Sequence, residues 1–171
     1  MKDYSDWPLT GFPGIATNPE TLVPEVIDEE LCAATLATTS DAAAEIFVLL
    51  ARGENSAAAE LIAEARLREP GSLPLRILEA DLSAAVNENE RAIRRLKNLS
   101  AEFRGSEGEA VIRQHLGKAY FVAGQYHAAA NSYALALELR VAAGASAALI
   151  YSSTVALQRA RDMAERFDSV A

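Results

Sequence analysis

The sequence predicts an all-helical protein. About a fifth of its 171 residues are alanine, the residue with the highest helix propensity, and aromatic residues make up only 6%. No run of alternating β-branched residues bounded by turn residues occurs, so we do not expect a substantial sheet. The length suits one domain with a hydrophobic core, and we expect a helical domain over residues 25–171 that follows an extended arm.

The arm, residues 1–24, is predicted to lack helices because it holds four prolines, which interrupt the helical hydrogen-bond pattern. Trp7 and Phe12 give it more apolar surface than a disordered tail usually has. Two interpretations are open. Either these side chains pack against the first helices of the same subunit, or the arm lies in a groove, its own or a neighbour's, in place of a ligand peptide.

A short helix is expected over residues 28–38, whose acidic first residues suit a helix amino end, and it is expected to cover the first helix pair. Seven further helices follow, each between start and stop signals. Their expected ranges are about 41–52, 57–68, 72–85, 90–103, 106–123, 125–143 and 146–167.

The helix starts are predicted from side chains that can accept hydrogen bonds from free backbone amides. Ser40 or Asp41, Ser72 and Ser146 are such residues. Pro74 suits the first turn of its helix, where a missing amide hydrogen costs little.

The signals around the next helix pair are also specific. Ser106 followed by Glu109 matches a capping box, which predicts a helix that begins at Ser106. Gly124 ends this helix, and its partner ends before Gly144.

Residues 116–137 carry small and aromatic residues at the spacing of two antiparallel helices in close contact. The residues are Leu116, Gly117, Tyr120, Gly124, Tyr126, Ala129, Tyr133 and Ala136. The pattern resembles the tetratricopeptide repeat (TPR), a stacking helix hairpin of about 34 residues. The resemblance implies an all-α, right-handed superhelix of about three TPR hairpins with a capping carboxyl-terminal helix and the extended amino-terminal arm.

The same pattern recurs upstream. The units are expected at about 39–72, 73–106 and 110–143, with the capping helix at about 145–168. The first unit is matched by Gly53, Ala58, Ile62, Ala65 and Pro70. The middle unit is degenerate, since Asn87 replaces the turn glycine.

The resemblance implies that a partner binds the concave surface, which the first helix of each unit lines. The expected peptide-binding residues are Phe47, Leu50, Ile77, Leu78, Asp81, Gln114, His115, Lys118, Phe121 and Val122, to which the last helix is expected to add Leu149, Ser152 and Val155. The basic residues and asparagines with which chaperone-binding members hold a terminal carboxylate are missing. An apolar groove suits an amphipathic helix or an extended hydrophobic peptide. Each apolar position can instead belong to the core.

We expect no catalytic site, no cofactor and no metal. Cys32 is the single cysteine, and His115 and His127 fall on different helices without clustered ligands. The glycines do not form a phosphate-binding loop, because no strand precedes them and no lysine followed by serine or threonine is present.

The net charge of −8 argues against nucleic acid as a partner, because phosphate binding depends on lysine and arginine. No apolar run of membrane-spanning length and no targeting segment is visible, so the sequence predicts a cytoplasmic protein without membrane association.

These features are compatible with three functions of the chain. The first is a non-catalytic scaffold or adaptor for a protein or peptide partner. The second is a small acidic chaperone for a secreted or assembly-prone client, and an enzyme is the weakest. Exposed apolar groove residues also allow a homodimer with crossed arms.

Overall fold

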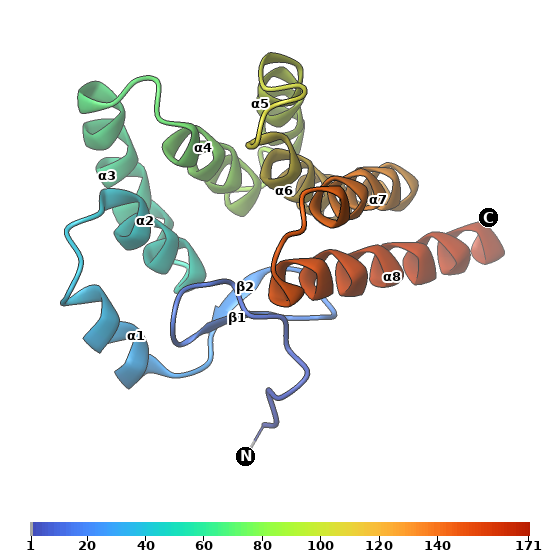
Figure 1. Ribbon diagram of the computed structural model, residues 1–171, viewed down its shortest axis with the longest axis horizontal. Coiled ribbons are helices and arrows are strands. Elements are labelled where there is room, and N and C mark those ends of the chain that lie inside the picture. The colour runs from blue at the N-terminus through green and yellow to red at the C-terminus, as the bar shows by residue number, and fades with distance from the viewer. Residues whose placement is uncertain (1) are drawn as a thin grey trace.

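The computed structural model describes residues 2–171 and confirms the all-helical prediction. Within that range the chain forms eight helices and one small two-stranded sheet (Figure 1). The helices are α1 (Glu29–Leu36), α2 (Ala42–Ala51), α3 (Asn55–Arg68), α4 (Leu73–Ala85), α5 (Asn89–Glu102), α6 (Glu109–Val122), α7 (Tyr126–Ala142) and α8 (Ala147–Val170).

Consecutive helices pair through short turns as α2/α3, α4/α5 and α6/α7, and α8 then packs on α7. Contacts also join α2 to α4 and α4 to α6, so the first helices of successive pairs lie next to one another. Figure 1 shows the helices arranged in a curve, with the amino-terminal segment on the inner side between α2 and α8.

Three predicted helix starts are confirmed by the side chains that cap them. Asp41 accepts a hydrogen bond from the amide of Ala43, Ser72 from Leu75 and Ser146 from Leu149. These acceptors satisfy amides that have no partner inside the helix. Asp28 caps α1 in the same way, through the amide of Leu31.

The predicted start of α6 at Ser106 is wrong, because this helix begins at Glu109. The Ser106 hydroxyl donates to the carbonyl of Phe103 and accepts from the amide of Gly108. The Glu109 carboxylate accepts from the amide of Gly105 at 2.7 Å. The two side chains therefore stabilise the turn before the helix rather than forming a capping box with each other.

The core between α6 and α7 depends on two small residues. Ala129 is fully buried, and a Cβ at Gly117 would lie 2.8 Å from the ring of Tyr133, which is itself buried. The two helices therefore approach closely because these positions lack larger side chains.

The sheet in the amino-terminal segment was not predicted. β1 (Ile15–Thr17) pairs antiparallel with β2 (Pro24–Val26), and Leu9 forms an isolated bridge to Ala16. Strands of three residues are too short to show alternation, and Pro24 sits at a strand end, where a missing amide is tolerated. The arm has no helix in its described residues, as expected.

Within the part of the chain that the structure describes, no helix combines the length and apolar character that crossing a bilayer requires.

Candidate binding face and the docked arm

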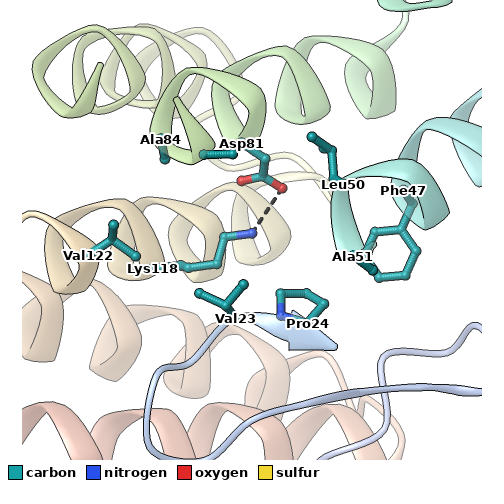
Figure 2. Close-up of a pocket in the computed structure, with 10 residues that line it drawn as sticks. Val23, Pro24, Phe47, Leu50, Ala51, Asp81, Ala84, Lys118 and Val122 are labelled. Atoms are coloured by element: carbon teal, nitrogen blue, oxygen red, sulfur yellow. Dashed lines mark ion pairs between the residues drawn. The ribbon is translucent and has the colours of Figure 1, made fainter. Parts of the chain in front are cut away.

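The side of the helices that meets the amino-terminal segment is called the inner face here. It consists of the residues of α2, α4, α6, α7 and α8 that border two cavities. The first cavity, of about 100 Å³, lies between α2, α4, α6 and the arm (Figure 2). It is lined by Val23, Pro24, Phe47, Leu50, Ala51, Asp81, Ala84, Ala85, Lys118 and Val122.

The second cavity, of about 180 Å³, lies between α6, α7, α8 and the arm. Its lining residues are Pro8, Leu9, Thr10, Thr17, Leu22, Pro24, Phe47, Val111, Gln114, His115, Lys118, Tyr133, Arg140, Leu149, Ser152, Val155 and Ala156. Pro24, Phe47 and Lys118 border both cavities, so the two spaces adjoin.

Seven of the ten residues proposed from the sequence as peptide-binding line these cavities. They are Phe47, Leu50, Asp81, Gln114, His115, Lys118 and Val122. The other three, Ile77, Leu78 and Phe121, lie in hydrophobic core clusters at 4%, 7% and 8% exposure. These three residues therefore belong to the core, which was the alternative left open for each apolar position.

A buried ion-pair cluster stands where the two cavities meet. The Asp81 carboxylate lies 2.9 Å from Nδ1 of His115 and 3.0 Å from Nζ of Lys118. Figure 2 shows the Asp81–Lys118 pair between α4 and α6. Burial by itself raises the pKa of Asp81, but the neighbouring charges and hydrogen bonds of His115 and Lys118 outweigh it and lower the pKa to about 2.

This cluster predicts acid sensitivity. The pKa of Asp81 is lower in the folded chain than in the unfolded chain, so the carboxylate stabilises the fold above about pH 4 and loses this effect as the pH falls toward 2. The loss is on the order of 2 kcal/mol. We expect Asp81→Asn to be less stable than the wild type at neutral pH but to have a flatter stability curve between pH 4 and pH 2. Denaturant unfolding at each pH measures this, and parallel curves would contradict it.

Leu22 is one of the residues that attach the arm to the inner face. Its side chain is 3% exposed and belongs to a core cluster with Phe121, Tyr133 and Ala156. Its backbone adopts a φ of +58°, a left-handed conformation that is costly for a residue with a branched side chain. Leu22 is therefore held in place by burial against an unfavourable backbone conformation.

Two hydrogen bonds from α8 hold the backbone of the arm. The Tyr151 hydroxyl donates to the carbonyl of Asp6 at 2.9 Å, and Nε of Arg159 donates to the carbonyl of Glu20 at 3.0 Å. Because both acceptors are main-chain atoms, these contacts do not depend on the side chains of the arm.

The arm shows features of both interpretations. The ring of Phe12 lies 6.3 Å from that of Phe47 on α2, as in the packing interpretation. Trp7 is buried and meets Tyr4 edge-on at 4.9 Å. Residues 22–24 meanwhile line the cavities of the inner face of the same chain, as in the groove interpretation.

Sequence reasoning missed Arg140, which lies on α7 with 7% exposure and lines the second cavity. A signal was available, since Arg140 follows Tyr133 and Ala136 at the spacing that continues the buried face of a helix. The expected contributions of the last helix, by contrast, do line the cavity: Leu149, Ser152 and Val155.

Each histidine contacts an aspartate of another helix, and neither partner was predicted from the sequence. His115 pairs with Asp81, and Nε2 of exposed His127 lies 3.1 Å from the carboxylate of Asp168. Residues 2–171 contain no group of three His, Cys, Asp or Glu side chains placed to hold a metal ion.

No protein-family model, curated protein or solved structure matches the chain.

Proposed function

We propose that the chain is a non-catalytic scaffold or adaptor built from tetratricopeptide-like helix hairpins. It binds a peptide or an amphipathic helix of a protein partner on its inner face. The hairpin order, with α2 next to α4 and α4 next to α6, supports a repeat stack. The close contact of Gly117 with Tyr133 supports the same assignment, since both residues belong to the repeat pattern.

The observation that carries the proposal is the position of the arm. The β1–β2 hairpin of this chain occupies the inner face between α2 and α8, with buried Leu22 and the neighbouring Val23 in its loop and Pro24 at the start of β2. Side-chain burial in pockets together with hydrogen bonds to the main chain is a way in which proteins hold peptide segments. A partner peptide with a similar apolar sequence would therefore use the same contacts.

The backbone of Leu22 favours exchange of the arm for such a partner. The left-handed conformation of a leucine costs about 1–2 kcal/mol relative to an ordinary one. A partner that places an apolar side chain in the same pocket without this conformation avoids the cost. The tethered arm still has the advantage of a high effective concentration, which for short linkers is in the millimolar range.

A peptide added to the full-length chain tests this. In Leu22→Asp the arm carries a charge that the apolar pocket disfavours, so the arm should leave the inner face. A labelled peptide with the sequence of residues 8–28 should then bind the variant at least about tenfold more tightly than it binds the wild type, because the tethered competitor is weakened. Fluorescence anisotropy measures both affinities.

Thr21→Asp is the matched control, because it adds the same charge at the exposed neighbouring position and should bind the peptide as the wild type does. A peptide that itself carries Leu22→Asp should not bind. If the Leu22→Asp protein keeps its helix content but does not bind the wild-type peptide, the inner face is not a peptide-binding site.

The partner can be sought with the same variant. Proteins from the native cell that are recovered with Leu22→Asp, and that the free arm peptide displaces, are candidates for the natural partner. A disordered amphipathic segment in such a protein favours the scaffold, whereas a secreted client favours the chaperone alternative.

A further inference from the structure

The second cavity has an unusual charge distribution for an acidic chain. The chain as a whole has a net charge of −8. Within residues 2–171, the charged or basic side chains that line this cavity are Arg140, Lys118 and His115, and no carboxylate lines it. Lys118 and His115 pair with Asp81 of the adjoining cavity, which leaves Arg140 as the basic residue of the three that no described carboxylate contacts. Most of the remaining wall is apolar, including Leu22, Phe47 and Val155.

Arg140 is buried without a counter-ion. Its Nη1 donates to the carbonyl of Leu149 at 2.9 Å, to Oγ of Ser153 at 2.7 Å and to Oε1 of Gln114 at 3.3 Å. All three acceptors are neutral, and Nε and Nη2 have no partner among the described residues. An isolated charge in a protein interior is costly unless a group of opposite charge compensates it.

Two further donors belong to the same wall. Tyr133 lies two helical turns before Arg140 on the same face of α7, and the structure gives its hydroxyl no hydrogen-bond partner within residues 2–171. Lys118 lies one turn after Gln114 on α6, and Gln114 contacts Arg140. The unpaired donors of Arg140 and Tyr133 thus border one space, and the ammonium group of Lys118 beside it already pairs with Asp81.

We propose that the cavity between α6, α7, α8 and the arm is a binding site for a small organic monocarboxylate, whose carboxylate meets the free edge of the Arg140 guanidinium. The planar guanidinium matches a carboxylate through two parallel hydrogen bonds. Tyr133, whose hydroxyl has no hydrogen-bond partner within residues 2–171, borders the same cavity. This proposal does not depend on the binding of a protein partner.

The volume of the second cavity and its apolar wall favour an acid with an apolar body over an inorganic anion. An engineered cavity of about 150 Å³ holds benzene, so a cavity of about 180 Å³ accepts a ring-sized apolar body in addition to the charged group. Inorganic phosphate would leave the wall formed by Leu22 and Val155 without contacts. The bound acid would also touch the arm, so the ligand would stabilise the docked arm.

Titration of the full-length chain with benzoate, at constant ionic strength, tests the proposal. Isothermal calorimetry should show saturable binding of benzoate to the wild type, weaker binding of acetate and none of inorganic phosphate. The Nε–H signal of Arg140 in 1H–15N spectra should shift with benzoate and reach a plateau. The shift is measured on the wild type, and for this readout Arg140→Lys is needed only to assign the signal.

Variants show whether Arg140 contacts the ligand or only supports the helix packing. Arg140→Lys keeps the charge but loses the two-pronged geometry, and it should weaken benzoate binding about tenfold. Tyr133→Phe should weaken it less, and Arg161→Met, on the exposed side of α8, should not change it. An Arg140 signal that does not move, or equal affinity of wild type and Arg140→Lys, would show that Arg140 only joins α7 to the start of α8.

Discussion

Replacement of Ala129 by arginine is expected to unfold the carboxyl-terminal half of the chain. Ala129 is fully buried in the cluster that joins α6, α7 and α8. Overpacking of a core costs about 1–3 kcal/mol, and an unpaired buried charge adds several more. Domains of this size are stable by only about 5–15 kcal/mol, so the substitution removes most of that margin.

Thermal unfolding followed by circular dichroism measures this effect. Ala142→Arg provides the matched control, since it makes the same change at the exposed carboxyl end of the same helix, where a positive charge is favourable. The control should melt as the wild type does. An Ala129→Arg protein with an unchanged melting temperature would mean that α6 and α7 do not pack as described.

Replacement of Gly117 by valine is expected to force α6 and α7 apart. The added Cβ alone would lie 2.8 Å from two ring atoms of Tyr133, and this ring is only 1% exposed and cannot move aside. We expect a loss of about 2–3 kcal/mol, because the overpacking outweighs the gain of a few tenths of a kcal/mol in helix propensity. Denaturant unfolding measures it.

Two further variants show whether the clash is the cause. Gly71→Val is the control, since a Cβ at Gly71 meets no atom within 4 Å. Tyr133→Ala combined with Gly117→Val should cost less than the sum of the single changes, because the smaller residue relieves the clash. Strict additivity of the two changes would show that Gly117 acts through something other than its contact with Tyr133.

The structural features that could be predicted are those determined by residues close to one another in the sequence. The caps at Asp41, Ser72 and Ser146 depend on hydrogen bonds to amides two or three residues away, and all three are present. The start of α6 was wrong for a local reason as well. Ser106 and Glu109 can bond either to each other's backbone amides, as in a capping box, or to backbone groups of the preceding turn. In the structure both side chains bond within the turn that begins near Phe103.

The features that were missed depend on contacts between distant segments. Nothing near Leu22 in the sequence indicates burial, since the pocket that holds it comes from α6, α7 and α8. Arg140 had a local signal in its spacing from Tyr133, but the lack of a counter-ion becomes visible only when α6 and α8 are placed around it. Seven of the ten positions proposed for the groove line the cavities, because helical spacing places residues of one helix on the same side.

The attachment of the arm also determines when the chain can complete its fold. The hydrogen bond from Tyr151 to Asp6 spans 145 residues, and that from Arg159 to Glu20 spans 139. During synthesis the arm leaves the ribosome well before its partners in α8 have been made. Leu22 therefore cannot complete its pocket until α8 has been synthesised, and this part of the docking comes after the earlier helices have left the ribosome.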